Sequence, residues 1–199
     1  IYRFNSYVRT ASRFPFAYII FLGPGPRPGC ANGFPICVII LFSTFWEVYV
    51  AQIEGNAAYI PAKDFVPKIE RCLKLLRTKA GAYCTWFEAY ALKLRAAARS
   101  GANFADNAID IAKPTFDSSD TWLASVIIHE TIHFWQYRSG KYQAGKVAES
   151  EANRYQLGVL QLLGAPQSEI TYMQSQDGGH ADRNGDGVYD WRDYESRNY

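Results

Sequence analysis

Apolar residues recur at helical spacing in two neighbouring segments that begin after about residue 56. In the first, "AKDFVPKIERCLKLLR", the stripe consists of Phe65, Ile69, Cys72, Leu73 and Leu76. In the second, "AYCTWFEAYALKLRAAAR", it consists of Tyr83, Phe87, Tyr90 and Leu94, and "SGAN" at 100–103 ends the pattern. Apolar positions three and four residues apart share one face of a helix. The pattern therefore predicts a hairpin of two helices.

A short alternating segment comes next. In "NFADNAIDIAKP", Ile109 and Ile111 flank Asp110, and the run ends at Pro114. Alternation with a period of two is typical of a strand, and a proline cannot donate to a β-ladder. The segment around Ala108 to Ile111 is therefore predicted to be an edge or terminal strand rather than a central one.

Two longer helices are predicted after this strand. Ser118, Ser119 or Asp120 can cap a helix that runs from about residue 121 to residue 138. A fourth helix is expected over residues 146–163, because a glycine at 164 and a proline at 166 are stop signals. The chain thus reads as mainly α, in an α+β arrangement with a short edge strand or small sheet. We expect the third and fourth helices to pack antiparallel.

Residues 1–55 differ in composition from the predicted domain (56–175) and from the C-terminal extension (176–199). The first 50 residues hold four Arg, no Lys and one acid, together with twelve of the 31 aromatic residues. The apolar run "ICVIILFSTFW" is too short to span a bilayer, which takes about 20 residues, so we expect no transmembrane anchor. Three interpretations stay open: an export signal, an Arg-rich organelle presequence, or a stretch without a stable fold. Export is slightly favoured.

The whole-chain charge and the cysteines narrow the possible functions only slightly. A formal charge of +2 provides no global field for nucleic acid or a membrane surface, so no nucleic-acid partner is expected. The four cysteines favour local pairing of Cys30 with Cys37 and of Cys72 with Cys84. The alternative, that they are small buried apolar residues, carries similar weight. The sequence assigns no oligomeric state.

The third predicted helix contains the pattern H-E-x-x-H, in "VIIHETIHFWQY". His129 and His133 are one turn apart on one face, and Glu130 lies at the edge of that face. With three His and nine Glu in the chain, chance produces this pattern only about 0.002 times. Two neutral imidazoles can bind zinc, and the glutamate can deprotonate a bound water. The helix is apolar nearly all round, so the alternative, two hydrogen-bonded core histidines, is less favoured.

Helix-hairpin counting indicates a third ligand. Across a turn centred near residue 141, facing residues have numbers that sum to about 282, so His133 faces Glu149 and His129 faces Asn153. Glu149 is expected to complete the zinc site, and Asn153 to orient a ligand imidazole. Glu151 lies about 200° round the helix from Glu149 and is expected to be a solvated carboxylate.

These motifs resemble the gluzincin class of zinc metallopeptidases, which includes thermolysin. The likeness rests on His129-Glu130-xx-His133 and the later Glu149-xxx-Asn153, and covers roughly residues 105–165. Asn153 departs from the usual aspartate of that class, and the metzincin extension is absent. Gln136 matches several H-E-x-x-H-x-x-Q families, and "ESEAN" resembles small domains related to bacterial antirepressor proteases. The resemblance implies a zincin-like helical domain.

It also implies peptide hydrolysis, with Glu130 as the general base toward a zinc-bound water. A peptide substrate could add to the predicted edge strand at 108–111. A further donor to the oxyanion is expected. The sequence does not choose among the candidates, which are Tyr137, Tyr142, Arg154, Tyr155 and His180.

A second ion site is predicted near the C-terminus, in "DRNGDGVYDWRD". Oxygen ligands fall at every second residue, with a glycine at the turn, as in an EF-hand or dockerin-type loop. The predicted calcium ligands are Asp182, Asn184, Asp186, the Val188 carbonyl, Asp190 and Asp193. We expect a structural calcium ion rather than a switch; the alternative is an acidic turn without an ion.

The leading hypothesis is therefore a zinc-dependent metallopeptidase with a calcium-stabilised C-terminal loop. Two alternatives stay open. One is a calcium-dependent interaction module with a degenerate, non-catalytic metal site. The other is a zinc hydrolase that acts on non-peptide amides.

Overall fold

A computed structural model describes residues 52–90, 92–142, 144–179, 182–188, 190 and 192–193. These residues belong to the unit Tyr49–Tyr199. The predictions for the N-terminal segment, including Cys30 and Cys37, lie outside the described residues.

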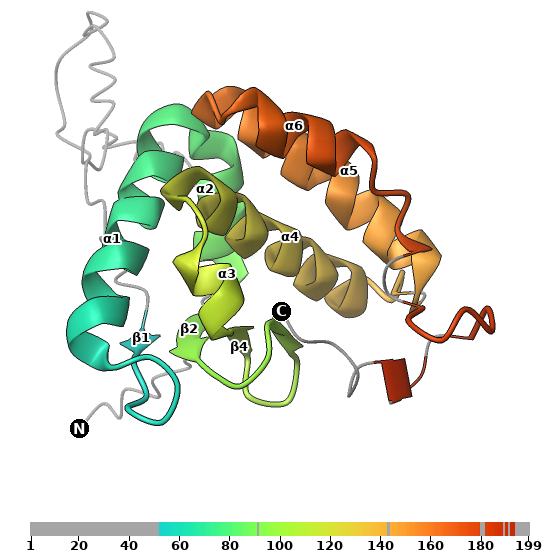
Figure 1. The fold of residues 1–199 in the computed structure, drawn as a ribbon, viewed down its shortest axis with the longest axis horizontal. Helices are drawn as coiled ribbons and strands as arrows, with labels where there is room; N and C mark the ends of the chain where they lie inside the picture. The colour runs from blue at the N-terminus through green and yellow to red at the C-terminus, as the bar shows by residue number, and fades with distance from the viewer. Residues whose placement is uncertain are drawn as a thin grey trace, which may run out of the picture. The chain divides into compact units, whose positions relative to one another are not determined.

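The described part of the chain is mainly helical, with a small four-stranded mixed sheet (Figure 1). The helices are α1 (Ala62–Lys79), α2 (Gly81–Tyr90), α3 (Lys113–Asp117), α4 (Asp120–Arg138), α5 (Lys146–Leu163) and α6 (Gln167–Gln174). The strands are β1 (Ile53–Glu54), β2 (Lys93–Ala96), β3 (Gly101–Asn103) and β4 (Ala108–Ile111). The predicted α+β class with few, short strands is confirmed.

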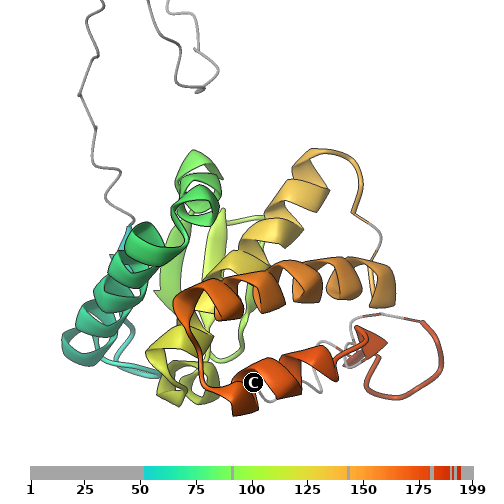
Figure 2. The same cartoon turned by 90° about the horizontal axis from the view of Figure 1, so that it is seen from above.

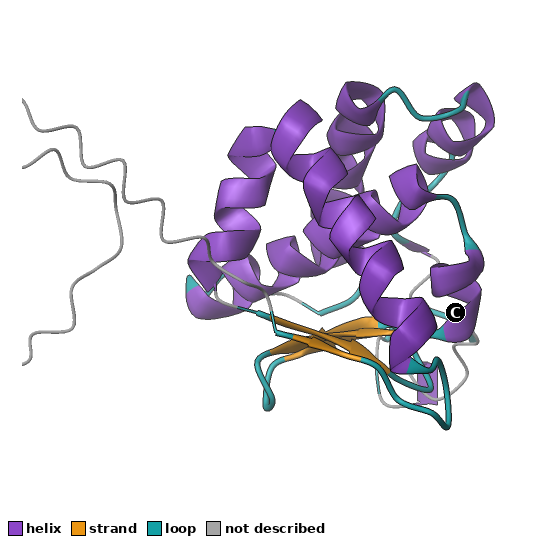
Figure 3. Cartoon of the chain, turned by 90° about the vertical axis from the view of Figure 1, so that its left-hand side faces the viewer, coloured by secondary structure: helices purple, strands orange, loops and turns teal. Residues whose placement is uncertain are grey.

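The sheet has the order β1-β2-β4-β3, in which β1, β2 and β4 are parallel and β3 runs antiparallel to β4. The helices lie on one face of this sheet (Figure 3). The apolar stripe predicted for α1 is confirmed, because all five of its residues are buried. The strand Ile53–Glu54 pairs with β2, so the domain begins before the predicted boundary at residue 56.

Two predictions about the middle of the chain were wrong. The second helix ends at Tyr90 instead of continuing to about residue 99, and β2 takes its place. Leu92, Leu94 and Ala96 are buried while Lys93 and Arg95 are partly exposed, which is the period of a strand.

The strand β4 is interior rather than at the edge, because β2 and β3 pair with its two sides. Pro114 lies beyond the strand, in the first turn of α3, where its missing N–H group interrupts no ladder. The edge beside β4 is therefore formed by β3.

The two helices predicted to carry the site are confirmed. Ser119 caps α4, and its hydroxyl accepts a hydrogen bond from the Trp122 N–H group at 2.9 Å. Gly164 ends α5 in the left-handed conformation, with φ of 70°. Figures 1 and 2 show α5 returning beside α4 in the opposite direction, and α6 packing along α5.

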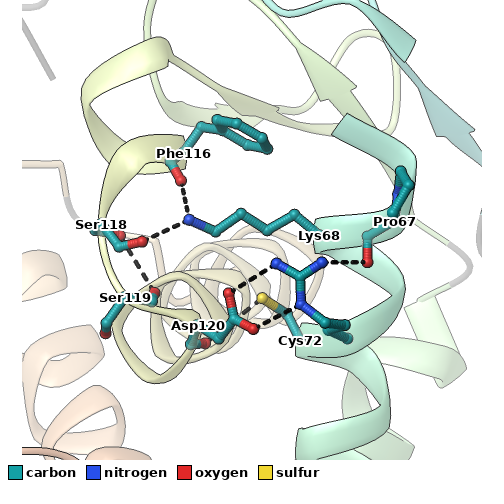
Figure 4. A network of polar contacts seen from close by, with 8 residues as sticks. Pro67, Lys68, Cys72, Phe116, Ser118, Ser119 and Asp120 are labelled. Carbon is teal, nitrogen blue, oxygen red and sulfur yellow. Dashed lines mark hydrogen bonds and ion pairs between the residues drawn. The ribbon is translucent and has the colours of Figure 1, made fainter. Parts of the chain in front are cut away.

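The start of α4 is fastened to α1 by polar contacts (Figure 4). The Lys68 ammonium donates to the Phe116 and Ser118 carbonyls, where α3 ends. Arg71 pairs with Asp120 at 2.9 Å. This network fixes the helix that carries the histidines against the first helix of the domain.

The predicted pairing of Cys72 with Cys84 was wrong, because both are free, buried thiols. The Cys72 thiol contacts the Asp120 carbonyl at 3.5 Å, and the Cys84 thiol contacts Glu88 at 3.6 Å. The alternative that we left open, small buried residues, describes this pair.

Across the helices in the described ranges, none combines the length and the apolar composition needed to cross a membrane.

Candidate metal centre

The centre begins with a helix that is buried almost all round. Apolar residues cover most of α4, so the polar side chains among them are withdrawn from water. His129 and His133 are 7% and 5% exposed, and Glu149 on α5 is 6% exposed. Buried polar groups need polar partners, and these three side chains are partners of one another.

Three ligand atoms converge at one point between α4 and α5. The Nε2 atoms of His129 and His133 lie 3.1 Å apart. Glu149 Oε2 lies 3.2 Å from the first nitrogen and 3.7 Å from the second. In a tetrahedral zinc site with bonds of about 2.0–2.1 Å, neighbouring ligand atoms are roughly 3.3 Å apart. The spacing therefore matches the base of such a site.

Among the described residues, this is the group of three His, Cys, Asp or Glu side chains whose ligand atoms lie within 4.8 Å of one another. The structure thus brings together the three residues that the sequence predicted as zinc ligands. The geometry admits other divalent ions with a similar coordination, because imidazole and carboxylate ligands suit several of them.

A hydrogen bond to Nδ1 determines which nitrogen of the neutral His133 ring carries the proton. Its Nδ1 atom lies 2.9 Å from Gln136 Oε1. The Gln136 Nε2 group donates to the Ala148 carbonyl at 3.1 Å and to Glu151 at 2.9 Å, so Oε1 is the amide atom that faces the ring. The neutral ring therefore carries its proton on Nδ1 and presents the Nε2 lone pair to His129 and Glu149, as metal binding requires.

The electrostatics of the cluster favour a positive charge beside Glu149. Burial alone lowers the pKa of His133, but the hydrogen bond and charge of Glu149 outweigh it and raise the pKa to about 9. Burial alone raises the pKa of Glu149, but the two histidines hold it well below the usual range of a carboxyl. Without a metal, a proton on His133 takes the place of the ion.

A cavity of about 360 Å³ opens beside these residues. His129, Glu130 and Glu149 line it, so the predicted general base and two of the predicted ligands share one space. Trp122 and Val126, which precede His129 by two turns and one turn on α4, also line it. A substrate group in this cavity would lie next to both the metal position and the Glu130 carboxylate.

Asn153 also lines the cavity, but no hydrogen bond joins it to an imidazole. Its Nδ2 atom and the Nδ1 atom of His129 are both buried, and neither has a partner among the described residues. The predicted orienting role of Asn153 therefore stays a prediction. In the tautomer of His129 that carries its proton on Nδ1, the Nε2 atom is free to bind a metal.

Glu151 differs from the expectation of a solvated carboxylate. Its side chain is only 34% exposed, and it accepts a hydrogen bond from Gln136. Glu151 is not part of the group of ligand atoms, but it contacts Gln136, which in turn contacts His133.

The candidates for an oxyanion donor lie elsewhere. Tyr137 stacks on Phe104, and Tyr155 packs against Trp86 with Arg154 over its ring. Tyr142 lies edge-on to the His133 ring, with centroids 6.2 Å apart. These four candidates are not among the residues that line the cavity, and His180 lies outside the described residues.

Sequence reasoning missed several polar residues that line the cavity, among them Tyr172 of α6 and Arg183. Neither belongs to a motif with the histidines. Arg183 falls inside the predicted calcium loop, and no pattern in the sequence connects that loop with the metal centre.

The predicted calcium loop is closed by its first and last acidic residues. Asp182 accepts hydrogen bonds from the Gly185 and Gly187 N–H groups at 2.7 and 2.8 Å. Asp193 is fully buried and accepts N–H groups of Arg183, Asn184 and Asp190 at 2.9, 3.3 and 2.9 Å. Within its described part, the loop forms no second group of three close ligand atoms.

The other predicted loop ligands are engaged locally. Asn184 Oδ1 accepts the N–H group of Asp186, and Asp186 Oδ1 accepts that of Val188, at 2.9 and 2.8 Å. Asp190 accepts the Arg192 N–H group at 2.8 Å. The calcium site stays a prediction.

Comparison with known proteins provides no further assignment. No family model, no curated protein and no solved structure matches this chain.

Proposed function

We propose that the protein is a zinc-dependent metallopeptidase whose ion is held by His129, His133 and Glu149. The observation that supports this most is the convergence of three buried ligand atoms, 3.1 to 3.7 Å apart, beside a cavity. An open fourth position toward a cavity is what separates catalytic zinc sites from structural ones. The zincin-like fold belongs to the same proposal.

The residues of this chain would divide the reaction between them. A zinc ion held by His129, His133 and Glu149 would supply an activated water and would polarise a carbonyl. Glu130 lines the same cavity, where its carboxylate can take a proton from the water and return it to the leaving amine. Trp122 and Val126 add apolar surface to the lining of the same cavity.

A peptide substrate would align on β3 rather than on β4. Among the described strands, β3 pairs only with β4, so it forms one of the two edges of the sheet. Ser100, which precedes β3, lines the cavity, so a strand added to this edge would pass close to the metal centre. Main-chain hydrogen bonds to an edge strand would hold the peptide in an extended form.

The experiment measures zinc content and peptide hydrolysis together, in the wild type and in Glu130→Gln. We expect one zinc ion in each protein, and hydrolysis that falls on the order of 10²–10⁴-fold in the variant, because only the proton acceptor is removed. Hydrolysis of simple amides but not of peptides would favour the non-peptide hydrolase. Zinc binding without any hydrolysis would favour the degenerate site of an interaction module.

We further propose that the C-terminal loop binds a structural calcium ion. The support is the spacing of its oxygen ligands and the closure of the loop by Asp182 and Asp193. Glycines with positive φ, at 73° and 81°, form its turns at positions 185 and 187.

A further inference from the structure

One buried side chain contacts both helices of the metal centre. Gln136, on α4, is 1% exposed and lies on the outer side of His133. Its amide makes three hydrogen bonds: to His133 Nδ1 at 2.9 Å, to the Ala148 carbonyl at 3.1 Å and to Glu151 at 2.9 Å. Both partners of its Nε2 group are pure acceptors, so the orientation of the amide is determined.

We infer that Gln136 is a positioning residue that holds two of the three metal ligands, one on each helix. Toward α4, its Oε1 accepts the Nδ1–H of His133 and so directs the Nε2 lone pair into the site. Toward α5, its Nε2 holds the carbonyl of Ala148, the residue directly before Glu149. The inference rests on the proposed metal site.

Glu151 anchors this arrangement at its far end. It is a carboxylate, so its hydrogen bond with the Gln136 amide is charge-assisted and stronger than a neutral one. The polarised amide is in turn a better acceptor for His133, because hydrogen bonds in a chain strengthen one another. In this proposal Glu149 binds the metal directly. Glu151 affects the metal ligand His133 indirectly, through its hydrogen bond with Gln136.

A matched pair of variants tests the inference. Gln136→Met removes the amide and keeps the size of the side chain. Gln156→Met does the same at another buried glutamine, on α5, which is 3% exposed and lines the cavity; it donates to Ser125 at 3.1 Å, not to an imidazole. Zinc affinity, measured by competition with a chelator, should fall about 10–100-fold in Gln136→Met. It should be unchanged in Gln156→Met.

A second readout does not depend on zinc. Long-range proton–nitrogen NMR spectra of the metal-free protein, recorded at a pH where the His133 ring is neutral, report which ring nitrogen carries the proton. The wild type and Gln156→Met should show the proton of His133 on Nδ1, and Gln136→Met should lose this preference. Equal zinc affinity in all three proteins, or the same tautomer in all three, would overturn the inference.

The two readouts separate two kinds of failure. A wild type that takes up no zinc contradicts the proposed function. In that case the tautomer of His133 is the readout that tests the role of Gln136. Equal zinc affinity of the wild type and Gln136→Met contradicts the positioning role of Gln136 but not the proposed metal site.

Discussion

His133 is the residue on which the polar contacts of the centre converge. Its two ring nitrogens face different groups, Gln136 on one side and His129 with Glu149 on the other. A buried carboxylate and two imidazole nitrogens that converge on one point favour a positive charge between them, either a metal ion or a proton. The arrangement therefore supports metal binding on electrostatic grounds, apart from any sequence motif.

Glu149 and Glu151 should contribute unequally to zinc affinity. Glu149→Ala removes a ligand, so affinity should fall by more than the roughly 10–100-fold typical of an outer partner. Glu151→Ala removes only the anchor of Gln136 and should stay within that range. Glu70→Ala, at an exposed position of α1, is the control and should bind zinc like the wild type. Isothermal titration with zinc measures all three. Equal losses for Glu149 and Glu151 would contradict the ligand assignment.

Cys72 and Cys84 should be unreactive in the folded protein. Burial raises the pKa of each thiol to about 12, so almost none of the reactive thiolate exists at pH 8. In a Cys30→Ser, Cys37→Ser background, iodoacetamide should modify neither residue in buffer and both in urea, as read by mass spectrometry. Rapid modification in buffer, or a mass 2 Da lower under non-reducing conditions, would contradict two buried free thiols.

At the scale of the element, the helices that carry the site are predictable because local signals agree with packing. The N-cap at Ser119 and the stop at Gly164 lie where their side-chain and backbone chemistry requires. Helix-hairpin counting then places Glu149 opposite the histidines, since both helices are regular through the site.

The strand β2 could not be separated from a helix by spacing alone. Leu94 satisfies the helical stripe of the preceding residues as well as an alternating pattern, and alanines continue on both sides. Partners distant in the sequence decide between the two, because Leu94 pairs with Ile53 and Ile109 in a sheet. The contacts of Gln136 and the place of Arg183 beside the cavity also depend on tertiary packing, so no local pattern indicates them.

The interior position of β4 has a measurable consequence at Asp110. This buried carboxylate binds Arg95 of β2 at 2.8 and 3.1 Å, and Arg95 also pairs with the exposed Asp106 at 2.9 Å. Asp110→Ala leaves a partly buried guanidinium short of a partner and should destabilise the domain by on the order of 3 kcal/mol. Asp106→Ala should cost less than about 1 kcal/mol. Urea unfolding measures both, and equal losses would contradict the burial of β4.

At the scale of the whole unit, the C-terminal segment packs onto the start of α5. Lys146 pairs with Asp177 at 2.6 Å. A Cβ atom at Gly178 would lie 2.5 Å from the Lys146 carbonyl and 2.7 Å from the Ser150 nitrogen, so only glycine fits there. The segment then places Arg183 at the cavity. The predicted calcium loop therefore lies close to the metal centre.

Calcium should stabilise the protein without switching its activity. A single loop with an affinity typical of extracellular modules, about 10⁻⁴ M, should contribute about 2.7 kcal/mol at 10 mM calcium. Thermal unfolding should therefore show a higher Tm in calcium than in an equal concentration of magnesium. The double variant Asp182→Asn, Asp186→Asn should lose this difference. An identical Tm of the wild type in both ions would contradict a calcium site.

The most direct test of the central claim is zinc K-edge X-ray absorption of the protein loaded with one equivalent of zinc. The account predicts a retained ion with only nitrogen and oxygen neighbours at about 2.0–2.1 Å, and outer scattering from two imidazole rings. A protein that retains no zinc after dialysis, a shell of sulfur at about 2.3 Å, or the absence of imidazole scattering would contradict a centre built from His129, His133 and Glu149.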